Sequence, residues 1–428
     1  FFTITPDCSA VYRVANLAGE MPDDLLTSHE NTLKYCLDYT KAKLGAIATR
    51  NPVACAQYFN YLMDIIVTVV LNWDTKRNCS KSGTGLFGQT EAYFSSTESQ
   101  GSTGNLHCHM LLWVRGMAKS VDEYYSACRS SAVRRKLVSY VESIAASSFP
   151  ISTDLCPCCE NTALISQPFR PEAFQRSTKS RERPTTAKCT NCSTSFGADE
   201  LIRRQMDSYA VSMGVEHEEW SGPSAHHHVA SPGPLPLPDP EKPLSTLVTC
   251  QALLQYQVHH WYHCKSCFKT TKRTPTGKVC RMFFPKEICN KTAWSADEKV
   301  LLRRETGSEY LNTYIPLVNS VFKCNHDVKF LTAAEGPEKA YYMMKYTTKD
   351  QNSVENPLAI HLHAYDKARL RVADCGNDAV AAGRRCVQSM CCSLSNAQEI
   401  SAPLAALYIE RGSPFYESVE FVNVHVWS

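Results

Sequence analysis

The chain lacks a strong charge of either sign, because its 45 lysines and arginines nearly balance 42 aspartates and glutamates, for a net charge of +3. A nucleic-acid-binding role therefore cannot be argued from overall charge. It has to rest on local basic stretches such as residues 176–188 and 269–278. The sequence also has no Gly-x-x-x-x-Gly-Lys-Ser/Thr phosphate loop, which excludes an ATP-driven motor of that type, and no internal repeat.

No uninterrupted apolar run is long enough to span a membrane, which takes about 20 mostly apolar residues. The longest run, residues 53–71, is broken by Gln57, Asn60 and Asp64 and is typical of a buried helix. The opening residues 1–5 lack the basic start and the cleavage site of a secretory signal, and the missing initiator Met suggests part of a longer protein. We therefore expect an intracellular protein with no membrane partner.

Cysteine, by contrast, is abundant, with 21 residues in a chain of 428. In an intracellular protein such thiols stay reduced, and paired thiols favour metal binding over disulfides. Two Cys-x-x-Cys pairs about 30 residues apart are typical of a tetrahedral zinc ribbon with an enlarged loop. The expected ligands are Cys156, Cys159, Cys189 and Cys192, with Cys158 as a spare thiol.

A second segment mixes histidines with cysteines between positions 259 and 289. The expected ligands of a second zinc ion are His259, His263, Cys267 and Cys280. The first three are spaced four residues apart, so they share one face if the segment is helical. The competing ligands are His260, Cys264 and Cys289. The plainer interpretation is a polar helix with scattered histidines.

Two histidines lie in the alternating segment 106–114, which is typical of a strand. Since side chains on a strand point alternately to its two faces, His107 and His109 share one face, opposite an apolar one. Glu98 lies on the preceding strand of an expected hairpin, whose turn returns its carboxylate toward the histidines. Two imidazoles and a carboxylate suit a catalytic Mg or Mn with open positions for phosphate and water. Gln100 is an alternative third ligand, and two ordinary polar strand residues are the plainer interpretation.

Tyrosines recur at helical spacing near position 340. Tyr342 and Tyr346, at i and i+4, share a helix face, and Lys345 adds a positive charge suited to DNA phosphates. A tyrosine nucleophile conserves the energy of the broken bond in a phosphotyrosine ester and leaves a free 3′ hydroxyl. Tyr341 points roughly 100° away on an ideal helix and ranks third. Core aromatic residues are the commoner meaning of such spacing.

In this order, the motifs resemble the replication-initiator (Rep) nuclease domain of Helitron-type rolling-circle transposases, within the HUH endonuclease superfamily. The resemblance covers nearly the whole chain. It rests, in order, on Phe2 to Asp7, the helix beginning at Asn51-Pro52, Glu98, Gly104 to His109, His263, Cys267 to Lys269, Cys280 to Pro285, Lys323 to Asp327, Tyr342 to Tyr346 and Glu399 to Trp427.

The resemblance implies an α+β fold, with an antiparallel HUH-type sheet flanked by helices and with inserted zinc-binding subdomains. It implies that His107 and His109 are metal ligands and that Tyr342 and Tyr346 are nucleophiles. The implied activity is cleavage and transfer of single-stranded DNA at transposon ends, in the nucleus, with a helicase domain in the full-length protein. The rival hypothesis is a catalytically inactive, zinc-containing DNA-binding protein derived from such a transposase.

The expected organisation has six parts. The first half of the nuclease core is expected at 1–150 and the zinc ribbon at 151–205. A Pro/Ser/His-rich linker, including the histidine run 226–228, is expected at 206–245. The remaining parts are a second zinc-like segment at 246–295, the tyrosine helix with the second half of the core at 296–350, and a segment leading toward a helicase at 351–428.

Overall fold

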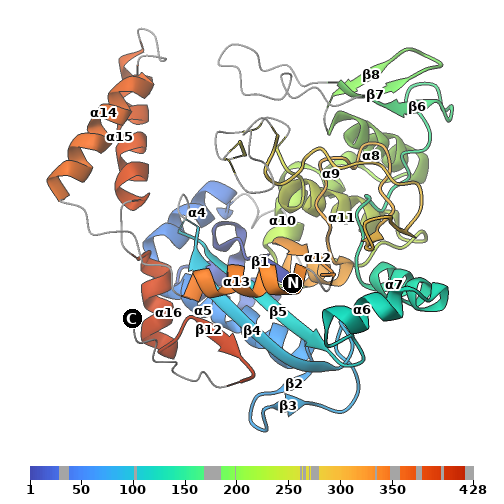
Figure 1. Ribbon diagram of the computed structural model, residues 1–428. Coiled ribbons are helices and arrows are strands. Elements are labelled where there is room, and N and C mark those ends of the chain that lie inside the picture. The colour runs from blue at the N-terminus through green and yellow to red at the C-terminus, as the bar shows by residue number, and fades with distance from the viewer. Residues whose placement is uncertain are drawn as a thin grey trace.

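The computed structural model describes residues 1–27, 38–100, 104–167, 185–197, 199–260, 263, 267–268, 270, 279–332, 335–347, 357–372, 378–396 and 400–419. At its centre is an antiparallel five-stranded sheet with the strand order β11-β1-β5-β4-β12 (Figure 1). These strands are β1 (Phe2–Thr5), β4 (Thr90–Ser99), β5 (Leu106–Val114), β11 (Asn325–Val328) and β12 (Phe415–Glu417). The expected α+β fold with an antiparallel sheet and helices is confirmed.

Most of the remaining elements of the described residues fall into three groups. Near the sheet lie η1 (Cys8–Ala10), α1 (Tyr12–Leu17), α2 (Asp24–Thr27), α4 (Lys41–Arg50), β2 (Trp73–Asp74), β3 (Cys79–Ser80), α6 (Val121–Cys128) and α7 (Ser131–Ile144). The inserted parts contain β6 (Leu164–Ser166), β7 (Thr185–Cys189), β8 (Ser195–Gly197), β9 (Ala293–Trp294) and β10 (Val300–Leu301). Toward the end of the chain lie α12 (Pro316–Phe322), α13 (Glu335–Thr347), α14 (Pro357–Val372), α15 (Ala379–Asn396) and α16 (Ala402–Arg411).

One face of the sheet is buried against the helix α5 (Pro52–Ile65), which continues into the π-helical turn η2 (Ile66–Val70). As the sequence predicts, α5 begins with Asn51 at its N-cap and Pro52 in its first turn, where proline's missing N–H costs nothing. The combined helix is long and apolar enough to cross a membrane by length and composition alone. Here, however, its buried side is a main part of the core beneath the sheet.

Residues 401–417, within the segment expected to lead toward a helicase, also form part of the sheet and its core. There, α16 packs against α5, and β12 pairs with the edge strand β4. Ser95 Oγ donates a hydrogen bond to the Tyr416 carbonyl oxygen at 3.0 Å, and the Tyr416 hydroxyl donates to Asn60 Oδ1 at 2.9 Å. Because β12 covers an edge that would otherwise expose unpaired backbone groups, this segment completes the sheet.

The prediction of a linker at 206–245 is wrong. The stretch contains most of α8 (Glu200–Met213), α9 (His217–Trp220), α10 (Gly222–Ala230) and the start of α11 (Pro243–Tyr256). Two of its prolines, Pro223 and Pro243, occupy the first turns of α10 and α11, where their fixed φ favours a helix, and the prolines between 232 and 240 lie in the irregular connection between these helices. The histidine run is packed: His226 Nε2 lies 2.9 Å from the Tyr39 carbonyl oxygen, and His227 contacts the ring of Tyr12.

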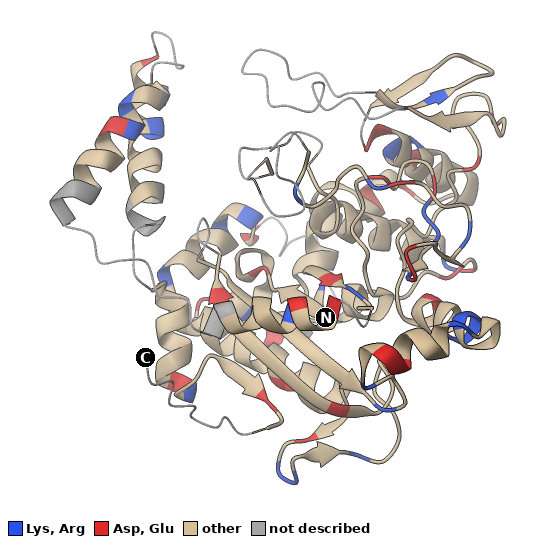
Figure 2. Ribbon diagram, viewed as in Figure 1, with Lys and Arg blue, Asp and Glu red and all other residues tan. Residues whose placement is uncertain are grey.

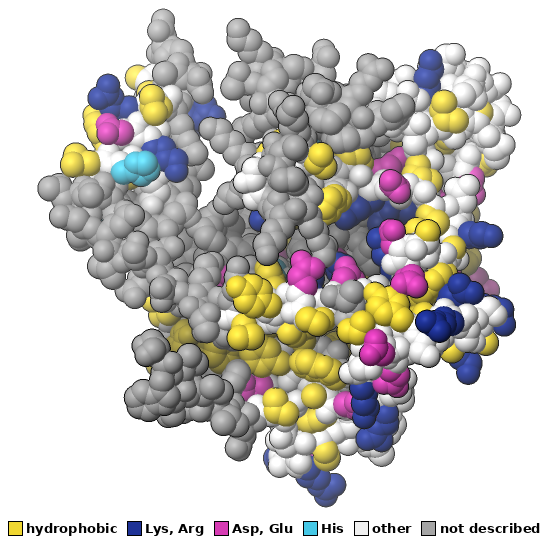
Figure 3. Space-filling view, viewed as in Figure 1, with side chains coloured by type: hydrophobic (Ala, Val, Ile, Leu, Met, Phe, Trp, Pro, Cys, Tyr) yellow, Lys and Arg dark blue, Asp and Glu magenta, His cyan; other side chains and the backbone are white. Residues whose placement is uncertain are grey.

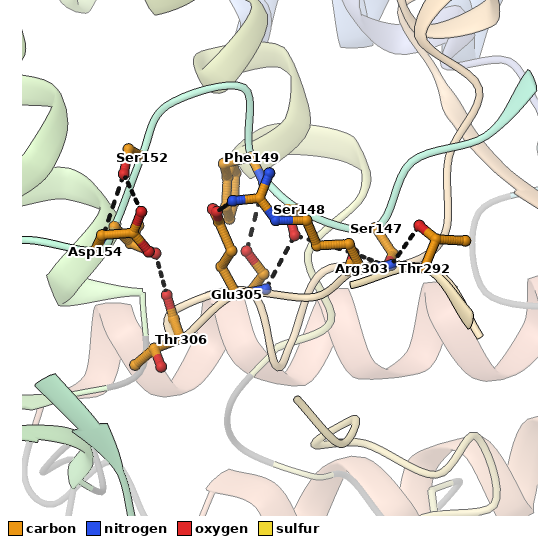
Figure 4. Close-up of polar contacts among 11 residues, drawn as sticks. Ser147, Ser148, Phe149, Ser152, Asp154, Thr292, Arg303, Glu305 and Thr306 are labelled. Atoms are coloured by element: carbon orange, nitrogen blue, oxygen red, sulfur yellow. Dashed lines mark hydrogen bonds and ion pairs between the residues drawn. The ribbon is translucent and has the colours of Figure 1, made fainter. Parts of the chain in front are cut away.

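The insertion that follows α7 is joined to the loop 303–309 by polar contacts (Figure 4). Ser147 Oγ and Ser148 Oγ both donate to the Arg303 carbonyl oxygen, at 2.8 and 3.1 Å. Thr153 Oγ1 donates to the Thr306 carbonyl oxygen at 2.6 Å. The segment that contains the first cysteine pairs is therefore attached to the loop that leads on to α12 and the edge strand β11.

Candidate active site and metal centres

The sheet register brings the predicted histidines and acid together. Thr3 and Ser96 lie opposite His109 on its two sides, and Glu98 lies opposite His107. Residues directly opposite in neighbouring strands share a face. The ligand atoms of Glu98, His107 and His109 all lie within 4.8 Å of one another, so the three can hold a single cation.

Hydrogen bonds from β1 orient both imidazoles. Thr3 Oγ1 lies 3.3 Å from His109 Nδ1, and Thr5 Oγ1 pairs with His107 Nδ1. On its other side, His109 Nε2 lies 3.4 Å from Glu98 Oε1. Partners on Nδ1 fix the ring orientation and make Nε2 the natural ligand atom, as in many metal sites. Sequence reasoning missed both threonines, although alternation along β1 was a signal that they share one face.

The surroundings of His107 favour its neutral form, which is the form that binds metal ions. Burial, and then the neighbouring His109, lower the pKa of His107 to about 3. Its imidazole is therefore neutral at neutral pH. The two rings lie edge to face, with centroids 4.3 Å apart. Glu98 supplies a negative charge at the same point.

The helix α13 crosses this face of the sheet and packs against β4 (Figure 1). It places the ring of Tyr342 with its centroid 5.5 Å from that of His109, in an edge-to-face contact. The histidine strand and the tyrosine helix, which are distant in sequence, thus meet at one site. Tyr341 is 59% exposed. The side chains of Lys345 and Tyr346 lie outside the described part of the chain.

Two neighbours of Tyr342 were not predicted. The ring of Phe1 stacks on His109 at 5.7 Å and meets Tyr342 edge-on at 6.2 Å. Lys339 Nζ lies 5.1 Å from the centroid of Tyr342 and 5.0 Å from that of Phe1. The spacing of i and i+3 from Lys339 to Tyr342 was a signal, since such helical neighbours adjoin.

The choice of third ligand is not decided by the geometry. Glu98 belongs to the cluster by distance. Gln100 follows β4 in the turn, where its backbone nitrogen donates to the Asn105 carbonyl oxygen at 2.8 Å. The role of either side chain as a metal ligand stays a prediction.

The four cysteines predicted for the zinc ribbon converge at one corner of the sheet β6-β7-β8. The Sγ atoms of Cys156 and Cys192 are 3.7 Å apart, as are those of Cys159 and Cys189. A tetrahedron with Zn–S bonds of about 2.3 Å has edges of about 3.8 Å, whereas a disulfide bond is about 2.05 Å. The spacing therefore fits zinc and not disulfides.

The local chemistry favours a thiolate at Cys159, whereas burial raises the pKa of Cys156 to about 12 in the absence of a metal. A hydrogen bond from the Asn191 side chain is the main cause that lowers the pKa of Cys159 to about 6. The backbone nitrogens of Cys158 and Cys192 lie 3.5 Å from Cys156 Sγ and Cys189 Sγ, where their N–H groups offset negative charge on sulfur. The Cys158 thiol is exposed and outside the cluster.

The second predicted cluster also forms, but not on a helix. His259, His263, Cys267 and Cys280 have ligand atoms within 4.8 Å of one another. The helix α11 ends at Tyr256, so the described residues of this segment lie in loops. The expected ligands are therefore not brought together on one face of a helix. Instead, His259 Nδ1 contacts the His260 carbonyl oxygen at 2.7 Å, and Nε2 lies 3.6 Å from Cys267 Sγ.

Of the competing ligands, His260 contributes its carbonyl oxygen to that contact, and Cys264 lies outside the described residues. Cys289 Sγ donates to the Lys291 carbonyl oxygen at 2.9 Å and is not part of the cluster. The described residues thus contain two Cys/His clusters that can each hold a zinc ion.

We expect the purified chain to contain about two zinc equivalents by elemental analysis. Cys189→Ser should lower this value to about one, because three remaining ligands bind zinc much more weakly. Cys158→Ser, between the expected ligands Cys156 and Cys159 but outside the cluster, is the matched control and should leave it unchanged. A Cys189→Ser protein that retains the wild-type zinc content would contradict the assignment.

Comparison of the chain with protein-family models, with curated proteins and with solved structures finds no match.

Proposed function

We propose that this chain has an HUH-type fold and is a metal-dependent endonuclease and strand transferase for single-stranded DNA, acting through a 5′-phosphotyrosine intermediate. The observation that carries the proposal is the 5.5 Å contact between Tyr342 and His109, beside the cluster of Glu98, His107 and His109. A phenol next to a cation-binding cluster is the equipment for attack on a phosphodiester.

In this proposal, His107 and His109, with Glu98 or Gln100, hold Mg or Mn. When bound, the ion supplies positive charge to the scissile phosphate. Tyr342 Oη attacks phosphorus, the bond to the 3′ oxygen breaks, the phenol loses a proton and the 3′ oxygen gains one. The products are a 5′-phosphotyrosine and a free 3′ hydroxyl.

Tyr346, at i+4 on the same helix, is proposed as the second nucleophile, for strand transfer, with Lys345 beside it. Two nucleophiles allow two DNA ends to be held in one reaction cycle. The proposal includes the transposon ends, the helicase partner and the nuclear location that the resemblance implies.

The sheet offers a surface suited to unpaired bases next to this site. Phe94 and Leu111 lie opposite each other on the histidine face, and Trp113, two positions further along β5, is 48% exposed. The rings of Phe94 and Phe415 are 6.0 Å apart. Figure 3 shows a band of hydrophobic side chains beside α13 in this region. Such rings stack on bases only where these are not already paired, which favours single-stranded substrates.

Because the net charge of the chain is small, the positive charge that binds the DNA backbone has to come from local groups of basic residues. The two stretches predicted from sequence, 176–188 and 269–278, lie largely outside the described residues. Among the described residues, the helix α7 carries Arg134, Arg135 and Lys136 in succession (Figure 2). This helix follows closely after the histidine strand in the sequence, and its cations suit phosphate contacts.

The test is covalent capture. A single-stranded oligonucleotide pool of random sequence, labelled at its 3′ end, is incubated with the protein and Mn or Mg, then separated by denaturing electrophoresis. We expect a labelled band at the size of protein plus DNA. Chelator and a fully duplex pool should each remove it. Binding of the pool without any covalent band, with either metal, would instead favour the inactive DNA-binding protein.

A further inference from the structure

Lys339 has no role in the reaction proposed above, yet its side chain lies beside the predicted nucleophile Tyr342. Its ammonium lies over the ring faces of Tyr342 and Phe1, at 5.1 and 5.0 Å. Those two rings also contact His109, at 5.5 and 5.7 Å between centroids. One turn of α13 therefore brings a cation and the predicted nucleophile together beside the metal-binding face.

The neighbouring cations have structural partners. Lys329 Nζ pairs with Glu335 Oε1 at 2.6 Å, and the other oxygen of Glu335 accepts from the Thr332 backbone nitrogen at 3.2 Å. These contacts hold the start of α13. Lys286 Nζ donates to the Met282 carbonyl oxygen at 2.8 Å. Lys339 lies against aromatic faces and, like Lys286 and Lys329, is attracted to the carboxylate of Asp327.

We propose that Lys339 binds the scissile phosphodiester while Tyr342 attacks it, which makes it a further catalytic residue of the proposed reaction. The inference rests on the proposed function. A phosphate within bonding distance of Tyr342 Oη lies near both the histidine cluster and this ammonium. Lysine is a compact charge with three donors, and its bonds to phosphate oxygens are charge-assisted.

The charge balance of the site supports this role. Attack adds negative charge to the non-bridging oxygens, on which a second cation acts in addition to the metal. Bond changes remain those of the proposed reaction, and Lys339 keeps its protons throughout. Arginine, which also binds phosphate, should partly replace it, whereas an uncharged side chain should not.

The experiment uses the full chain and the oligonucleotide sequence recovered from wild-type adducts. Lys339→Met should lower the rate of adduct formation about 100-fold, as the loss of one transition-state donor typically does. Lys339→Arg should recover part of the rate. The matched control is Lys367→Met, which removes an equal charge from an exposed position on α14.

A second measurement distinguishes a direct contact between Lys339 and the phosphate from a purely structural role of this residue. The scissile phosphate is replaced by each stereopure methylphosphonate, which removes one non-bridging charge. If Lys339 contacts that oxygen, the losses from Lys339→Met and from one methylphosphonate isomer should be far less than additive. Additive losses for both isomers would overturn the assignment and indicate a structural role. Adducts that form at the wild-type rate in Lys339→Met would overturn it as well, with the proposed function intact. Absence of adducts from the wild-type chain would refute both proposals.

Discussion

Replacing Tyr342 and Tyr346 together with phenylalanine should abolish covalent DNA adducts while leaving single-stranded DNA binding largely intact. Phenylalanine keeps the ring of Tyr342, and with it the contact with His109, but removes the attacking oxygen. The expected loss of adduct is complete within the range of the gel, at least about 10³-fold. Fluorescence anisotropy with a labelled oligonucleotide should give a dissociation constant within about threefold of wild type, because stacking and phosphate contacts remain.

The single variants assign the two roles. Tyr342→Phe alone should prevent first-strand cleavage, since this is the ring placed beside the histidine cluster. Tyr346→Phe should still form an adduct but lose transfer of a second strand. Tyr341→Phe is the matched control, because this neighbouring tyrosine is 59% exposed. Adducts that persist in the double variant would refute the assignment of the nucleophiles.

The histidine face was predictable because its causes are local. Alternation along 106–114 fixes which side chains share a face, and the short loop before it makes β4 and β5 a hairpin, which sets Glu98 opposite His107. The cysteine clusters were predictable for a related reason: zinc geometry requires ligands in close pairs, and the pairs are visible in the sequence.

Non-local pairing set the limit of sequence reasoning. Nothing near Phe415 indicates that it pairs with Ser96, because the match depends on an exposed edge created by the rest of the sheet. The linker prediction failed for a different reason. Proline occurs both in flexible segments and at helix starts, and the partners of the histidines 226–228 show that this stretch is packed. Thr3 and Thr5 were missed as partners of the histidines because their roles follow from the β1–β5 register.

Loss of the histidine cluster should be as severe as loss of the tyrosines, but with a different signature. His109→Ala should lower the adduct rate about 10³-fold, because the charge at the scissile phosphate is lost. Mn titration followed by electron paramagnetic resonance should show one site in the wild-type chain and none in the variant. The zinc content should stay unchanged, because both cysteine clusters lie elsewhere.

Weaker variants of the same site test its geometry in steps. Thr5→Val removes the hydrogen bond to His107 Nδ1 but leaves both imidazoles, so Mn affinity should fall about 10- to 100-fold, as is typical for the partner of a metal ligand. Glu98→Ala and Gln100→Ala then decide the third ligand, since only the true ligand should change the Mn spectrum. If neither His109→Ala nor Thr5→Val alters Mn binding, the cluster on the sheet is not the metal site, and the proposed chemistry loses its cation.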